Sequence, residues 1–117
     1  MNRKALGRWG EERTAEYLRD KGLNVLEHNY RCPVGEIDLI AQQDGTLVFV
    51  EVKTRRSLGF GLPAESVTFK KQKKYFKIAQ YYMKEKGIKN SSCRFDVVEV
   101  MISRDGSYHF NHITNAF

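Results

Sequence analysis

The chain has 117 residues, a formal net charge of +6, 41% hydrophobic residues and 29% charged residues. This length suits one folded domain over residues 1–117, and the share of apolar residues argues against a disordered chain. No apolar run is long enough to cross a membrane, and the basic first residues are not followed by an apolar signal core. We therefore expect a cytoplasmic protein without a membrane partner.

The first predicted element is a helix from about Arg3 to Lys21, a proline-free run that stops at Gly22. Helical spacing places Glu11 on a face with small and apolar side chains, whereas Glu12 falls on a charged face. Glu11 is therefore a candidate third carboxylate of a site. Its alternative role is to cap or to pair with an arginine at the edge of the core.

Three strands are predicted next, one from Leu23 to Tyr30 and two that form a hairpin over residues 35–53. The hairpin contains two apolar runs joined at Asp44-Gly45, a dipeptide typical of two-residue turns. Such a turn pairs Gln43 with Thr46 and fixes the register of everything that follows.

In this register Asp38 lies directly opposite Glu51, and Glu36 lies opposite Lys53. A carboxylate inside an apolar strand costs free energy unless it is paired, and two directly opposed carboxylates repel each other. We therefore expect a cation between Asp38 and Glu51. The alternative is a cross-strand ion network of these four residues without a catalytic role.

Mg²⁺ or Mn²⁺ is the natural cation, because Mg²⁺ prefers oxygen ligands and is typically held by carboxylates together with substrate phosphates. Lys53 lies two residues beyond Glu51 on the same strand face. Its ammonium group suits the stabilisation of a pentavalent phosphate or of an attacking water. Asp38, Glu51 and Lys53 together indicate phosphodiester hydrolysis.

The runs Gly35-Glu36-Ile37-Asp38 and Phe49-Val50-Glu51-Val52-Lys53 resemble the PD-(D/E)XK nuclease superfamily, especially archaeal Holliday-junction resolvases. The chain resembles the bacterial YraN-like proteins more closely still. That likeness covers nearly the whole sequence and includes Gly10-Glu11 and His28-Asn29-Tyr30-Arg31. Ile37, not the proline of the superfamily's name, precedes Asp38, and resolvase-like members also lack that proline.

The resemblance implies a restriction-endonuclease-like α/β core, in which a mixed central β-sheet lies between helices. It further implies that Asp38 and Glu51 bind the metal with help from Glu11, and that Lys53 is catalytic.

A strongly basic stretch follows the proposed metal site. Between Lys53 and Lys77 there are eight basic residues against one acid, Glu65, a net charge of +7. Such a stretch suits a groove for a phosphate backbone, although lysine-rich helices are often only solvated surface. The candidate nucleic-acid contacts are Arg55, Arg56, Lys70, Lys71, Gln72 and Lys74.

The remaining elements are a loop over residues 54–65, a helix from about Ser66 or Val67 to Lys86, and a final hairpin. The hairpin strands are expected at Arg94 to Ile102 and Ser107 to Ile113. The complete order is α-β-β-β-α-β-β, which agrees with the core that the resemblance implies.

The leading interpretation is a metal-dependent DNA endonuclease, with structure-selective cleavage like that of the resolvases as one option. The alternative is a non-catalytic nucleic-acid-binding protein that retains the nuclease fold. A third interpretation is a structural partner protein whose lysines meet an acidic surface. A homodimer would suit symmetric cutting of two strands, but no interface is readable in the sequence.

Overall fold

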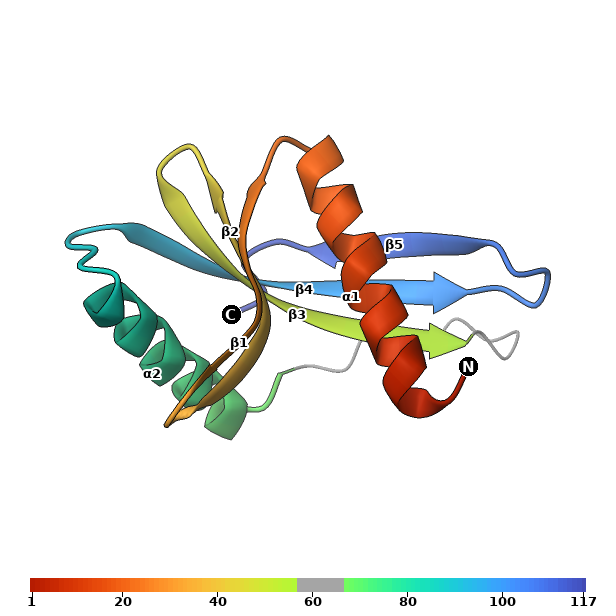
Figure 1. The fold of residues 1–117 in the computed structure, drawn as a ribbon, viewed down its shortest axis with the longest axis horizontal. Helices are drawn as coiled ribbons and strands as arrows, with labels where there is room; N and C mark the ends of the chain where they lie inside the picture. Colours follow the sequence, from red (N-terminus) through yellow and green to blue (C-terminus); the bar gives the residue numbers. More distant parts are fainter. Residues whose placement is uncertain (57–66) are drawn as a thin grey trace.

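The computed structural model describes residues 1–56 and 67–117. In chain order its elements are α1 (Arg3–Asp20), β1 (Asn24–Cys32), β2 (Gly35–Gln43), β3 (Thr46–Arg56), α2 (Phe69–Glu85), β4 (Ser92–Ile102) and β5 (Tyr108–Ile113). The strands form one sheet in the order β1-β2-β3-β4-β5, with α1 and α2 on opposite sides of it (Figure 1). Only β3 and β4 are parallel neighbours. The predicted mixed α/β fold and element order are confirmed.

Local signals set the ends of both helices. The Asn2 side chain accepts a hydrogen bond from the Ala5 N–H at 2.8 Å, and the Thr68 hydroxyl accepts one from the Lys71 N–H at 3.2 Å. Each bond satisfies a backbone donor that the first helical turn leaves without an intrahelical partner. After α1 the chain turns at Gly22, whose φ of 91° favours glycine. Neither helix in the described ranges is long and apolar enough to cross a membrane.

The β2–β3 hairpin has the predicted turn. Asp44 and Gly45 have φ angles of 48° and 80°, as a two-residue turn with both central residues left-handed requires. The ladder runs from Gln43 opposite Thr46 to Leu39 opposite Val50. The register that the Asp-Gly turn predicts is therefore confirmed over these pairs.

Each face of the sheet buries its own apolar cluster, so the sheet is covered on both sides. The α1 side contains Ala15, Leu18, Leu39, Val48, Val50, Val98 and Val100. The α2 side contains Tyr30, Ile37, Ile40, Leu47, Phe49, Tyr75, Ile78 and Phe95. Burial of this much apolar surface is the main stabilising contribution to the fold.

β1 and β2 bend sharply away from β3, and this bend corrects the expected pairing of Glu36 with Lys53 (Figure 1). Ile37 and Ile40 pack in the same cluster although strict alternation would separate them. The break in alternation falls around Asp38, and Asn29 on the neighbouring strand has a φ of 50°. Because β2 leaves β3 here, Glu36 does not pair with Lys53. It forms an ion pair with Arg31 of β1 at 3.3 Å instead.

The loop predicted over residues 54–65 is partly wrong. Thr54, Arg55 and Arg56 continue β3, because each has a partner on β4 in a parallel ladder that extends to Ile102. Residues 57–65 of that prediction lie outside the described residues. The predicted helix and final strands are confirmed as α2, β4 and β5 within a few residues at each end.

Candidate active site

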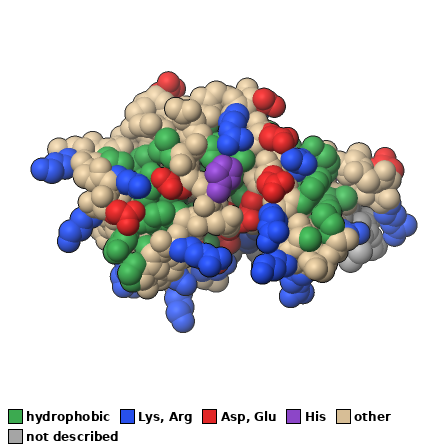
Figure 2. All heavy atoms as spheres, in the orientation of Figure 1, with side chains coloured by type: hydrophobic (Ala, Val, Ile, Leu, Met, Phe, Trp, Pro, Cys, Tyr) green, Lys and Arg blue, Asp and Glu red, His purple; other side chains and the backbone are tan. Residues whose placement is uncertain are grey.

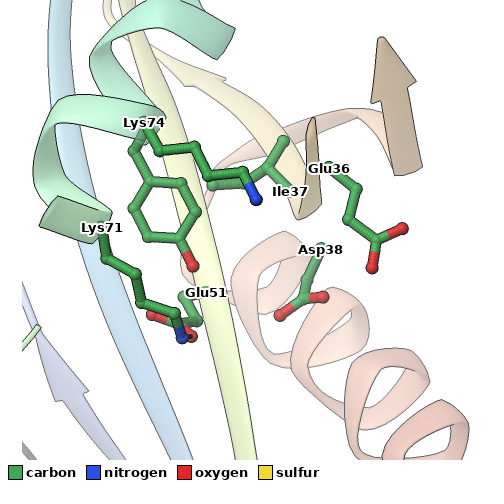
Figure 3. Close-up of a pocket in the computed structure, with 7 residues that line it drawn as sticks. Glu36, Ile37, Asp38, Glu51, Lys71 and Lys74 are labelled. Atoms are coloured by element: carbon green, nitrogen blue, oxygen red, sulfur yellow. Dashed lines mark hydrogen bonds and ion pairs between the residues drawn. The ribbon is translucent and has the colours of Figure 1, made fainter. Parts of the chain in front are cut away.

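A cavity of about 250 Å³ lies where β2 separates from β3, under the N-terminal half of α2. Figure 3 shows acidic side chains from the strands and two lysines from the helix around one space. Its lining residues are Glu36, Ile37, Asp38, Glu51, Lys71, Lys74 and Tyr75. The bend in β2 therefore creates the cavity and brings Asp38 and Glu51, predicted as a pair, to its walls.

Asp38 occupies the position just past the last β2–β3 ladder pair. One of its carboxylate oxygens accepts a hydrogen bond from the Val52 N–H at 2.8 Å and so replaces a ladder bond that the bend removes. Burial and the charge of Glu51 raise the pKa of Asp38, against the lowering effect of the Val52 N–H and Glu11. Asp38 is thus a fixed carboxylate in an acidic environment.

Glu11 reaches Asp38 from α1, on the other side of the sheet from α2. Burial, the charge of Asp38 and a hydrogen bond to Asp38 raise the pKa of Glu11 to about 7. Both pKa values are raised, so the two carboxyl groups behave as a pair that holds a proton at a higher pH than either group would alone. The helical spacing that singled out Glu11 therefore identified a neighbour of the strand carboxylates.

Glu51 lies on β3 with its side chain 13% exposed. Its Oε1 accepts from the Lys71 ammonium group at 3.1 Å. Its Oε2 is buried and, among residues 1–56 and 67–117, has no hydrogen-bond partner. Burial and the charge of Glu51 raise the pKa of the Tyr75 hydroxyl, which faces the same carboxylate. A buried carboxylate oxygen without a donor is costly, and a bound cation would remove that cost.

Lys53 follows Glu51 on the same face of β3 and is half-buried. Its partner in the parallel ladder is Glu99 of β4, a carboxylate that is 3% exposed. Arg55, the next residue on that face, has its Nε 4.0 Å from a Glu99 oxygen. Arg55 therefore approaches a buried acid of β4. Lys53 is the ladder partner of the same acid, and it lies two residues after Glu51 on β3.

The other predicted nucleic-acid contacts do not all lie at the cavity. Lys71 and Lys74 line the cavity, and Lys70 and Arg56 are exposed. The Gln72 side chain donates to the Val67 carbonyl at 3.0 Å, so it closes the start of α2 and does not face the cavity. On the face drawn in Figure 2, Lys and Arg side chains gather along the lower edge, over α2 and the first turns of α1.

Three cavity residues, Glu36, Ile37 and Tyr75, were not among the predicted site residues. Tyr75 is four residues after Lys71, so helical spacing places it on the same stripe as that lysine. Glu36 reaches the cavity only because β2 bends. Nothing in the sequence pattern distinguishes it from an ordinary exposed strand residue.

The donor set fits a hard divalent cation in chemistry, although the residues need to move to enclose one. Carboxylate oxygens of Asp38, Glu51 and Glu11 are the ligands that Mg²⁺ and Mn²⁺ prefer. The unpartnered Glu51 Oε2 is an available ligand atom. Within the described parts of the chain, no three His, Cys, Asp or Glu side chains already converge as an ion cage. Two contacts compete with a cation: the ion pair of Lys71 with Glu51 Oε1, and the proton that the Glu11 and Asp38 carboxyl groups hold between them.

Comparisons with known proteins give one consistent family. The model of "Uncharacterised protein family UPF0102" matches residues 10–100. UPF0102 proteins of Caldicellulosiruptor saccharolyticus and Dictyoglomus turgidum are each 46% identical to this chain over 118 residues, covering 100% of both chains. A UPF0102 protein of Caldanaerobacter subterraneus is 48% identical over 119 residues, covering 100% of this chain and 98% of its own. The matched region contains every strand and helix residue that lines the cavity.

Proposed function

The chain belongs to the UPF0102 family, and we propose that it is a metal-dependent endonuclease that hydrolyses DNA phosphodiester bonds. The resemblance of its Asp38 and Glu51-x-Lys53 pattern to the PD-(D/E)XK superfamily supports this proposal. In this proposal Asp38 and Glu51 hold Mg²⁺ or Mn²⁺, Glu11 assists them, and Lys53 is catalytic. The protein acts in the cytoplasm, and a homodimer would serve paired cuts.

One observation carries the proposal: the buried Glu51 Oε2 has no donor among the described residues and shares a cavity with Asp38. A buried carboxylate oxygen without a donor costs about 1–3 kcal/mol, and a cation bound beside Asp38 would offset that cost. The basic residues of α2 lie beside these acids, where the negative phosphate backbone would approach them.

The bound ion would polarise a phosphate oxygen and lower the pKa of a water molecule. Asp38 is held in place by the Val52 N–H, so it offers a fixed ligand direction. A cation in the site would lower the raised pKa of Glu11, so that Glu11 would release its proton to solvent and offer a carboxylate to the ion. Lys53 places an ammonium group on the same strand face as Glu51, suited to the negative charge that develops on the phosphate in the transition state.

A second candidate is a nucleic-acid-binding protein that retains the fold without catalysis. The observation that favours it is the Lys71–Glu51 ion pair of 3.1 Å, because Lys71 already neutralises one of the two strand carboxylates. In this candidate the lysines of α2 bind the backbone and the acids only hold those lysines in position.

The two candidates are separated by cleavage assays on labelled linear, flap and four-way-junction DNA with Mg²⁺ and with Mn²⁺. We expect cleavage by the natural protein and none by Glu51→Gln or Lys53→Ala, while each variant keeps most of its DNA affinity. Glu12→Gln is the matched acid control, because its side chain is 60% exposed on the opposite face of α1 from the core.

Cleavage that persists in both Glu51→Gln and Lys53→Ala would refute the assignment of these residues. Salt-sensitive DNA binding without cleavage of any substrate with either metal would favour the second candidate. Equal binding to DNA and to other polyanions would instead favour the structural partner protein.

A further inference from the structure

A second polar cavity of about 330 Å³ lies near the C-terminal end of α1, against β4 and β5. The described residues that line it are Tyr17, Lys21, Leu23, Gln43, Arg94, His112 and Thr114. None of these residues lines the candidate active site. Lys21 and Arg94 are cations, and the described lining residues include no Asp or Glu, so the cavity has positive character.

Asp96 lies beneath this cavity with a side chain that is 0% exposed. Three donors use its carboxylate: Arg94 Nε at 3.2 Å, His112 Nε2 at 2.8 Å and the Asn115 N–H at 3.1 Å. Burial opposes the charge of Asp96, but the three hydrogen bonds outweigh burial and lower the pKa of Asp96. The acid therefore stays ionised and holds Arg94 and His112 at the cavity floor.

His112 continues the chain of contacts upward, because its Nδ1 lies 3.1 Å from the Tyr17 hydroxyl. Tyr17 is held in place by stacking on Phe110, with ring centroids 4.4 Å apart. The Lys21 ammonium group lies 5.6 Å from the centroid of the Tyr17 ring. A hydroxyl, an imidazole, a guanidinium and an ammonium group thus surround one hollow.

The contacts of His112 determine where the Tyr17 hydroxyl donates its hydrogen bond. With Asp96 ionised, His112 Nε2 donates to it, so a neutral His112 accepts the Tyr17 proton at Nδ1. The Tyr17 O–H can instead turn toward an anion in the cavity and donate to it. The groups that face His112 are Asp96 and Arg94 from β4, and Tyr17 and Lys21 from α1.

We propose that this cavity is an oxyanion site that binds a phosphate group through Lys21, Arg94 and the Tyr17 hydroxyl, which His112 holds in position. Charge-assisted bonds from Lys and Arg together with a hydroxyl donor are the usual means of phosphate recognition. The ligand is either free phosphate or a phosphodiester of bound nucleic acid. The proposal is independent of the candidate active site, because it uses none of its residues.

The test is an NMR titration of the His112 ring signals in the presence of a chelator, with inorganic phosphate, with sulfate and with a short DNA duplex. We expect a saturable shift with phosphate and with sulfate. Tyr17→Phe keeps the ring stacked on Phe110, and Lys21→Ala removes an exposed charge, so both variants should fold. Each should weaken binding at least fivefold, whereas Lys84→Ala on α2 should not change it.

Duplex DNA that moves the same signals and competes with phosphate identifies a nucleic-acid contact, and duplex DNA without effect identifies a site for free phosphate. A shift that does not saturate, or equal affinity in Tyr17→Phe and Lys21→Ala, would overturn the proposal. Because no cleavage is measured, failure here would leave the nuclease proposal unaffected.

Discussion

Replacing Glu11 by glutamine should stabilise the metal-free protein at alkaline pH and leave it nearly unchanged at acidic pH. The pKa of Glu11 rises from an ordinary 4.5 to about 7 because of burial and of Asp38. A group with a raised pKa favours folding below its ordinary pKa, and that contribution is lost as the pH rises through the folded value. Above about pH 7 the ionised Glu11 therefore lowers the free energy of unfolding.

The rise in pKa corresponds to roughly 3 kcal/mol at about 1.36 kcal/mol per pKa unit. Glu11 is partly exposed, so solvent screening reduces the effect to about 1–2 kcal/mol. For a chain of this size that equals an increase in Tm of roughly 4–8 °C. A glutamine amide can still donate to the Asp38 carboxylate, so the hydrogen bond between α1 and β2 is retained.

The assay is thermal and urea unfolding with a chelator at about pH 5 and at about pH 8, across the window set by the Glu11 shift. Glu12→Gln is the control, because Glu12 lies one residue away on the exposed face of the same helix. A Glu11→Gln effect that is equal at the two pH values, or a loss of stability at about pH 8, would refute the proton shared with Asp38. With added Mn²⁺ at about pH 8, the natural protein should become more stable than Glu11→Gln, because the ionised Glu11 would then help to bind the metal.

Three further perturbations test the packing and the charges of the structure. Lys71→Gln should tighten Mn²⁺ binding by roughly three- to fivefold in calorimetric titration, because it removes a competing half-exposed ion pair to Glu51; unchanged affinity would contradict the competition. Asp96→Asn should cost about 3 kcal/mol in urea unfolding near pH 7, because it leaves buried donors without their charge. Since the pKa of Asp96 is lowered, this loss should shrink as the pH falls below its ordinary 3.8; a difference independent of pH would contradict it. Gly10→Ala should destabilise by about 1–3 kcal/mol, because its new Cβ meets the Thr54 hydroxyl. Gly7→Ala has open space around it and should stabilise by about 0.5–1 kcal/mol; equal effects at the two glycines would be inconsistent with the packing.

The sequence predicted the elements well because their signals are local. Asn2 and Gly22 mark the ends of the first helix, and Asp44-Gly45 specifies a tight turn, which in turn fixes the β2–β3 register. The same register placed Asp38 near Glu51, and helical spacing distinguished Glu11 from Glu12. Each of these inferences needs only neighbours along the chain.

The geometry of the site depends on contacts that no local pattern encodes. β2 bends away from β3 at Asp38, and this bend moves Glu36 to Arg31, opens the cavity and admits Tyr75 and Lys71 from α2. Strand alternation assumes a regular pleat, so it placed Glu36 opposite Lys53. Gln72 was a candidate nucleic-acid contact because it lies among the lysines of the basic stretch. Its side chain instead donates to the Val67 carbonyl, a contact that only the folded structure shows.

The sequence by itself predicted the candidate site residues: two strand carboxylates, a lysine two positions on, and a helix glutamate. Turn and helix signals act over a few residues, so the order of those residues is sufficient to specify them. The tertiary structure alone decided that Glu11 shares a proton with Asp38, that Lys71 neutralises Glu51, and that Asp96, His112 and Tyr17 line up beneath a second cavity. These pairs are 16 to 95 residues apart or come from opposite faces of the sheet, and only the packing of both helices against a bent sheet brings them into contact.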